Sequence, residues 1–189
     1  MTDLEYRRGF VLDRYNMLAV RAFGGVVIPC GNSDQVPFER KYWTGGANGI
    51  RAWPVRTLGP GSYKADPNEF PNQTGDIKLE ANAEYRFNIY KYFKGALFMD
   101  AGNVWLQKSN PSDIGTPFRF SGFMNELAVG AGAGLRVDVS FFVLRFDLAI
   151  PLRKPWLTNQ RWVTNEIDFT DATWRRENLM LNIAIGYPF

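Results

Sequence analysis

Charged and apolar side chains alternate along the segment from Gly75 to Ile89. Its even-numbered positions carry mainly charged or amide side chains, and its odd-numbered positions carry mainly apolar ones. Because successive side chains of a β-strand point to opposite faces, this period of two predicts a long strand with one polar and one apolar face. In a helix, the same residues would be scattered around the whole circumference.

Six further segments show the same alternation. They are Leu4–Leu12, Met17–Ile28, Phe93–Trp105, Glu126–Val139, Phe142–Ile150 and Leu179–Phe189. Nearly all reach the roughly 9–11 residues that a tilted strand needs to cross a bilayer, whereas strands of soluble proteins commonly have about 5–6. Short joints alternate with three long loops, Pro29–Thr74, Leu106–Phe123 and Arg153–Glu177. This arrangement predicts an all-β fold, an antiparallel transmembrane β-barrel.

The composition of the polar face separates a membrane barrel from a soluble one. In the segment 126–139 this face carries Gly130, Gly132, Gly134, Arg136 and Asp138. Small and charged residues suit a wet, crowded lumen, and the apolar face then meets lipid. The alternative is a soluble barrel of the lipocalin type, whose apolar interior holds a ligand. The pattern favours the membrane barrel.

Aromatic residues lie near several predicted strand ends, among them Tyr92, Trp105, Trp156 and Tyr187. Barrels of outer membranes carry such residues in girdles at the two membrane interfaces. We therefore expect these four side chains in the girdles.

Composition excludes most catalytic chemistry. The chain has no histidine and only one cysteine, Cys30, so it holds no histidine-based triad, no internal disulfide and no histidine or cysteine metal site. We expect no enzyme activity, no cofactor and no metal. The net charge of +3 comes from scattered residues without a basic run, which argues against nucleic acid as a partner.

Two short motifs and the end of the chain carry a more specific pattern. The first loop contains Ile50-Arg51-Ala52-Trp53, followed by Leu58-Gly59-Pro60-Gly61, and a later strand contains Phe98, Asp100 and Gly102 at alternate positions. The chain ends on Ile185, Tyr187 and Phe189, again at alternate positions. These segments resemble the sixth extracellular loop, the Phe-x-Asp-x-Gly strand and the terminal β-signal of the outer membrane protein 85 superfamily. The loop is most similar to that of the TamA/TamL branch.

The resemblance implies a sixteen-stranded barrel in the bacterial outer membrane, of which residues 1–189 would form the C-terminal portion, with residues 29–74 as the motif-bearing loop. The POTRA domains of the family are not among these residues. The implied function is insertion or translocation of client β-barrel proteins through a weak seam at the last strand. The implied partners are outer-membrane lipid, the clients, and a TamB-like periplasmic protein or a second copy of the chain. The alternative is a small independent outer-membrane barrel without insertase activity, completed by an extra strand or, as a dimer, by a partner chain.

Arg51 is the candidate functional residue of the loop. A loop arginine either points to water or folds inward and pairs with a carboxylate of the lumen. The predicted lumen face offers Asp100, Glu84 and Glu80, and the match to the strand motif favours Asp100 in a bidentate pair. Glycines at 45, 46 and 49 would bend the loop inward, and the glycines at 130, 132 and 134 would leave room for it. Ala52 stands where many members of the family have glycine.

Overall fold

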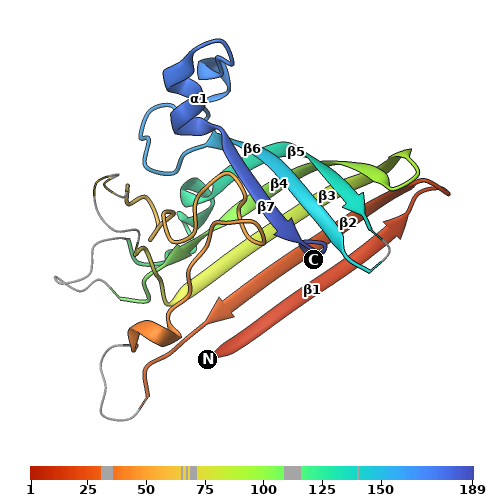
Figure 1. Ribbon diagram of the computed structural model, residues 1–189. Helices are drawn as coiled ribbons and strands as arrows, with labels where there is room; N and C mark the ends of the chain where they lie inside the picture. The colour runs from red at the N-terminus through yellow and green to blue at the C-terminus, as the bar shows by residue number, and fades with distance from the viewer. Residues whose placement is uncertain (31–35, 65, 67, 69–71, 109–115, 140) are drawn as a thin grey trace.

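The computed structural model describes residues 1–30, 36–64, 66, 68, 72–108, 116–139 and 141–189 (Figure 1). Within them, seven antiparallel strands form one sheet in chain order. The strands are β1 (Thr2–Val11), β2 (Asn16–Val26), β3 (Ile77–Tyr90), β4 (Phe93–Trp105), β5 (Ala128–Asp138), β6 (Val143–Arg153) and β7 (Met180–Ile185). β1 and β7 are the two edges of this curved sheet, which confirms the predicted all-β fold as part of a barrel.

Short turns connect the strands at one end of the sheet, and the long loops gather at the other end (Figure 1). The loops contain the 3-10 turns Phe38–Arg40, Phe123–Glu126 and Thr164–Glu166, and one short helix, α1 (Ala172–Asn178). The alternation pattern did not predict α1, which starts after a capping residue: Asp171 accepts hydrogen bonds from two backbone N–H groups of the first turn. No helix in the described ranges has the length and apolar character needed to cross a membrane.

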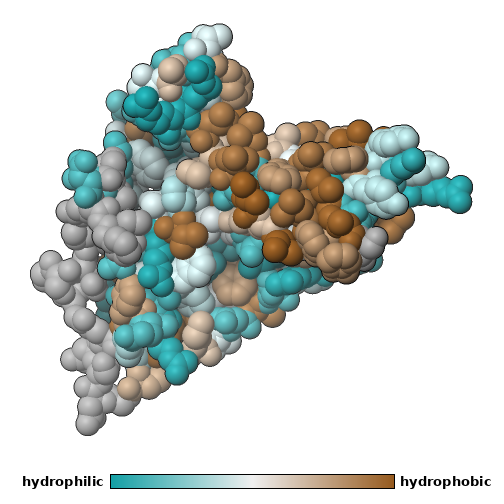
Figure 2. All heavy atoms as spheres, viewed as in Figure 1, coloured by the Kyte–Doolittle hydropathy of each residue, from teal (hydrophilic) through white to brown (hydrophobic). Residues whose placement is uncertain are grey.

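The register of the strands separates a polar inner face from an apolar outer face. Arg21, Asn82, Asp100 and Gly130 lie side by side across β2 to β5 on the inner face, against which loop 36–64 packs. The outer face exposes large apolar side chains, including Leu97, Met99, Leu148, Leu181, Ile183 and Ile185. Figure 2 shows hydrophobic residues gathered over one side of the sheet. Such a continuous exposed apolar surface fits contact with lipid.

The last strand is shorter than the alternation predicts. It ends at Ile185 because Gly186 adopts a left-handed conformation, with φ of 88°, and Pro188 has no backbone N–H to donate. Ile185 therefore lies on β7, whereas Tyr187 and Phe189 lie in a tail that leaves the sheet. The predicted strand Leu179–Phe189 is wrong for its last four residues.

Trp105 is also placed differently from the prediction. Its side chain is fully buried instead of facing lipid in a girdle. The following loop covers it: Phe118 and Phe123 pack edge-on against its ring, and its indole Nε1 donates to Glu126 at 2.6 Å. Tyr92, in contrast, is exposed at the turn between β3 and β4.

Candidate functional site in the sheet interior

Loop 36–64 folds back onto the inner face of the sheet through a tight glycine bend. Gly45 and Gly46 have φ of 94° and 78°, a conformation that L side chains rarely adopt. The Gly46 N–H donates to the carbonyl of Trp53 at 2.8 Å, which closes the bend around the loop motif. Gly49 does not adopt a positive φ. Its role is close approach, because a Cβ there would lie 3.0 Å from Glu80 Oε1.

Apolar side chains on both flanks of Arg51 hold the loop in place. Ile50, Ala52 and Trp53 are buried, and they pack with Leu58 of the loop and with Phe98 of β4. Burial of a side chain such as that of Ile50, Leu58 or Phe98 stabilises by about 1.5–3 kcal/mol. In this motif, apolar residues therefore flank an arginine that is directed at the sheet, and they exclude water from around it.

Arg51 is buried and binds one carboxylate with two guanidinium nitrogens. Its Nε donates to Asp100 Oδ2 at 2.8 Å, and its Nη2 donates to Asp100 Oδ1 at 2.9 Å. The backbone N–H of Arg51 donates to the same carboxylate at 3.1 Å. The guanidinium also lies over the Phe98 ring, 3.5 Å from its centre. The structure thus brings the arginine of the loop motif against two residues of the strand motif in a bidentate, stacked geometry.

Glu84 is the second carboxylate that Arg51 contacts. Its Oε2 accepts hydrogen bonds from Arg51 Nη1 at 2.6 Å and from Arg136 Nη2 at 3.0 Å. Its Oε1 accepts one from Arg86 Nε at 2.8 Å. A single side chain of β3 therefore joins the loop, β5 and the turn-side part of the inner face.

Asp147 of β6 is a third carboxylate of the site and was not among the predicted partners of Arg51. It accepts hydrogen bonds from Arg136 Nη1 and, at 3.4 Å, from Arg51 Nη1. Arg145 lies beside it, with Nε at 3.4 Å from Asp147 Oδ2, and its Nη2 donates to Ala47 O and Asn48 Oδ1 of the loop at 2.9 and 2.7 Å. The same alternation that placed Asp100 on the inner face also places Asp147 there, so a signal for it was present.

These six buried side chains form the arginine–carboxylate cluster: Arg51, Arg136, Arg145, Glu84, Asp100 and Asp147. Three guanidinium groups face three carboxylates, so the formal charges cancel. Burial alone would lower the pKa of Arg51, but hydrogen bonding to Asp100 and the nearby carboxylate charges raise this pKa above its ordinary value. The Arg51 guanidinium therefore stays charged against its carboxylate partners.

Glu80, the third partner predicted for Arg51, does not contact it. Its carboxylate binds Arg21 Nη1 and Lys78 Nζ, both at 3.0 Å, and accepts a hydrogen bond from the Thr44 hydroxyl. Glu80 and Glu84 share a face but lie four residues apart on β3, about 13 Å along the strand. Because one guanidinium cannot reach both, Glu80 supports the glycine bend of the loop while Glu84 holds Arg51.

A separate contact fastens the start of the loop to the edge strand β1. The Tyr42 hydroxyl donates to the Asp3 carboxylate, and the Tyr42 ring packs edge-on against Phe23. Burial and the bond to Asp3 both raise the pKa of Tyr42, because each disfavours the phenolate.

Of the three glycines of β5 predicted to leave room for the loop, Gly130 does so, whereas Gly132 and Gly134 lie against residues of the strands. A Cβ added at Gly130 would lie 2.5 Å from the Ala52 Cβ, and one added at Gly132 would lie 2.5 Å from Phe98 Cζ. Gly102 of the strand motif serves a different contact, since a Cβ there would lie 2.4 Å from the backbone oxygen of Leu79. Ala52 is accommodated because Gly130 stands opposite.

We expect Gly130→Ala to displace the loop motif and to lower the free energy of unfolding by about 1–3 kcal/mol, the usual cost of overpacking. Urea unfolding of the full chain in detergent micelles measures this. The double variant Gly130→Ala/Ala52→Gly removes the 2.5 Å clash, because the other nearest atoms lie at 3.4 Å, and should recover most of the loss. Failure of Ala52→Gly to rescue would contradict the assigned contact.

The C-terminal tail turns back over the inner face near the short turns. The Arg86 guanidinium lies 4.4 Å from the centre of the Tyr187 ring, and its Nη2 donates to the Phe189 carbonyl at 3.3 Å. Lys94 Nζ lies 3.4 Å from the Tyr187 hydroxyl. Since Arg86 also binds Glu84, the tail is connected to the arginine–carboxylate cluster through one side chain.

The arrangement of the site is that of a structural anchor for the loop. In the part of the chain that the structure describes, no group of three acidic or cysteine side chains is placed to hold a metal ion. Each carboxylate of the cluster is engaged by arginine. The cluster fixes a long loop across the inner faces of β3, β4, β5 and β6. The loop also contacts β7, because Asn182 Nδ2 donates to the Arg51 carbonyl at 2.9 Å.

An antiparallel sheet with an apolar outer face, and a polar inner face locked to an inward-folded loop, defines part of an outer-membrane β-barrel. Residues 2–170 match the model of the Omp85 superfamily domain. The chain therefore belongs to the Omp85 superfamily, and its location is the bacterial outer membrane.

Two individual proteins show the extent of the similarity. The outer membrane protein assembly factor BamA of Neisseria meningitidis serogroup B is 28% identical in an alignment of 148 residues, and the match covers 69% of this chain and 18% of BamA. The structure of CdiB from Acinetobacter baumannii matches with a TM-score of 0.52 at 16% identity, covering 97% of this chain and 26% of CdiB. The match to CdiB shows a shared fold. The chain spans about a fifth to a quarter of the length of these relatives.

Proposed function

We propose that this chain is the seam-bearing part of an outer-membrane assembly barrel of the TamA/TamL type, which inserts client β-barrel proteins. Its work is mechanical: β-ladder hydrogen bonds form and break, and no covalent bond changes. The observation that carries the proposal is β7, an edge strand of six residues, whereas the other strands have ten to fourteen. Membership of a superfamily that includes an outer membrane protein assembly factor supports it.

The free edge of β7 offers backbone donors to an incoming strand. The Gly186 N–H donates to the Val143 carbonyl at 2.7 Å, and Ile185 pairs with Leu144. Because N–H groups of a strand point alternately to its two sides, the N–H groups of Asn182 and Ala184 point toward β6 and that of Ile183 points to the free edge. A client strand can therefore add to β7 by β-augmentation.

The arginine–carboxylate cluster holds the strands next to β7 in a fixed arrangement. It ties β3, β4, β5 and β6 to the loop, so these strands form a platform that holds one wall of the barrel. β7 joins the platform through its short ladder to β6 and through Asn182. We propose that β7, because it has fewer contacts than the platform strands, is the strand whose pairing opens when a client strand binds.

We expect Ile183→Pro to reduce client insertion by the full chain in liposomes by about five-fold or more, since it removes one edge N–H worth about 1 kcal/mol and bends the template. Proline is tolerated at edge positions whose N–H faces outward, so the barrel should still fold. The measurement is the rate at which a client becomes protease-protected.

Ile183→Ala is the matched control, because it shortens the same side chain but keeps the N–H. It should insert clients close to the wild-type rate. Wild-type insertion by a folded Ile183→Pro variant would rule out β7 as the template.

A further inference from the structure

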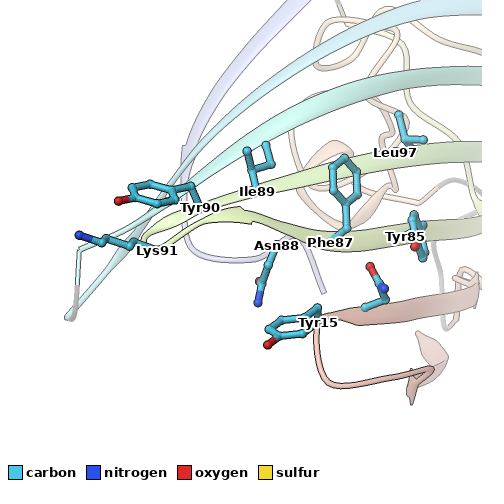
Figure 3. Close-up of a pocket in the computed structure, with 9 residues that line it drawn as sticks. Tyr15, Tyr85, Phe87, Asn88, Ile89, Tyr90, Lys91 and Leu97 are labelled. Carbon is cyan, nitrogen blue, oxygen red and sulfur yellow. The ribbon is translucent and has the colours of Figure 1, made fainter.

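A groove of about 800 Å³ lies where the outer face meets the short turns. Its lining includes Tyr15 from the turn between β1 and β2, Tyr85, Phe87 and Ile89 from β3, and Tyr90 and Lys91 at the turn to β4. In Figure 3, Tyr90 and Lys91 lie at the tip of the turn, and Tyr85 and Leu97 lie further along the strands. None of these residues belongs to the arginine–carboxylate cluster.

The floor of the groove is apolar and flat. The Tyr85 and Phe87 rings stack with centroids 5.8 Å apart and an angle of 28° between their planes. The Phe87 ring covers Gly95, where an added Cβ would come within 2.3 Å of its Cζ. Leu97 continues the floor and is exposed on the outer face. This end of the groove is thus continuous with the surface that contacts lipid.

The rim of the groove has the opposite character. Tyr15 and Tyr90 are exposed, and the Lys91 ammonium lies 5.2 Å from the centre of the Tyr90 ring. Arg14 is exposed in the neighbouring turn and adds a second positive charge. Asp13, beside it, accepts hydrogen bonds from the backbone N–H groups of Tyr15 and Asn16. The groove therefore passes from an apolar floor to a cationic, hydroxyl-bearing rim.

Lys91 stands where the backbone favours a different residue. Tyr90 pairs with Phe93, so Lys91 and Tyr92 form a two-residue hairpin turn, and Lys91 has φ of 42°. Such turns favour asparagine or glycine at positions of positive φ. A lysine held there at a conformational cost points to a use for its ammonium group.

We propose that this groove binds an anionic phospholipid of the leaflet on the short-turn side. One acyl chain lies along Tyr85, Phe87 and Leu97, and the headgroup phosphate meets the Lys91 ammonium and the hydroxyl groups of the rim. The combination of charge complementarity at one end and continuity with the lipid-facing surface at the other selects a lipid over a soluble anion. The site does not depend on the proposed insertase activity.

The test is native mass spectrometry of the full chain in a neutral detergent, titrated with phosphatidylglycerol or with phosphatidylcholine of the same acyl chains. We expect the wild type to retain phosphatidylglycerol preferentially. Lys91→Asn should weaken this retention about five-fold, the effect of one lysine charge near an anionic surface. Because asparagine suits a positive φ, Lys91→Asn should unfold in urea at the same or a higher concentration than the wild type, so lost binding would not reflect misfolding.

Lys108→Asn is the matched control, since Lys108 is an exposed lysine beyond the opposite end of β4. It should leave retention unchanged. Equal retention by the wild type and Lys91→Asn would overturn the proposal, as would equal retention of the two lipids by the wild type. Displacement of the lipid by millimolar inorganic phosphate would also overturn it, because it would indicate a simple anion site.

Discussion

Arg51→Ala is expected to release loop 36–64 from the inner face and to lower the free energy of unfolding by about 3–5 kcal/mol. This is the usual cost of removing one partner from a buried ion pair. The variant leaves Asp100 without its bidentate partner and removes one of the donors to Glu84 and Asp147. We expect cleavage by trypsin at Lys41 and Arg56 to accelerate, and client insertion to fall, because the platform beside β7 loosens.

Arg40→Ala provides the control for this prediction. Arg40 lies in the same loop but is exposed, and replacing an exposed charge changes stability by less than about 1 kcal/mol. Urea unfolding in detergent micelles and timed proteolysis compare the two variants. Unchanged protease sensitivity together with unchanged insertion in Arg51→Ala would refute the role of the Arg51–Asp100 pair.

Glu84→Ala is expected to have a comparable cost, about 3–5 kcal/mol, but a wider effect. Glu84 binds both Arg51 and Arg86, and Arg86 in turn holds the tail at Tyr187 and Phe189. Hydrogen exchange followed by mass spectrometry should therefore show faster exchange both in the loop and in residues 184–189. Arg51→Ala, which leaves the contacts of Arg86 intact, should speed exchange in the loop but not in residues 184–189.

The exposed Glu39 offers the control variant Glu39→Ala, which should alter exchange in neither segment. The double variant Arg51→Ala/Glu84→Ala should lose less stability than the sum of the single losses, because the two side chains share a contact. Tail exchange that stays at the wild-type rate in Glu84→Ala would contradict the connection between loop and tail.

The faces of the strands could be predicted from alternation alone. A strand has a side-chain period of two, so the polar parity of β3 and β4 placed Glu80, Glu84 and Asp100 together on one face. Seven strands, the lengths of most of them and the short and long connections followed from the same pattern and from the turn residues. Alternation also placed the glycines of β5 on the inner face, where Gly130 lies opposite the loop and the other two lie against strand residues.

Selection among the residues of one face needed the register and the path of the loop. Alternation treats Glu80, Glu84 and Asp147 alike, yet only Glu84 and Asp147 lie within reach of Arg51. The position of a carboxylate along the barrel axis depends on the offset between the strands. The position of Arg51 depends on where the glycine bend places the loop motif. Both are properties of contacts between segments far apart in the chain.

Adjacent residues encode which side of each strand faces lipid and which faces the interior, so this choice could be read from the alternation. The same alternation indicated that Arg51 had carboxylates available to it. The pairing with Asp100, Glu84 and Asp147, the burial of Trp105 beneath its loop and the inward turn of the tail at Gly186 became visible in the folded chain. The physical reason is that a buried charge is stabilised by the particular partners within about 3 Å of it, and those distances are set by register and loop path rather than by local pattern.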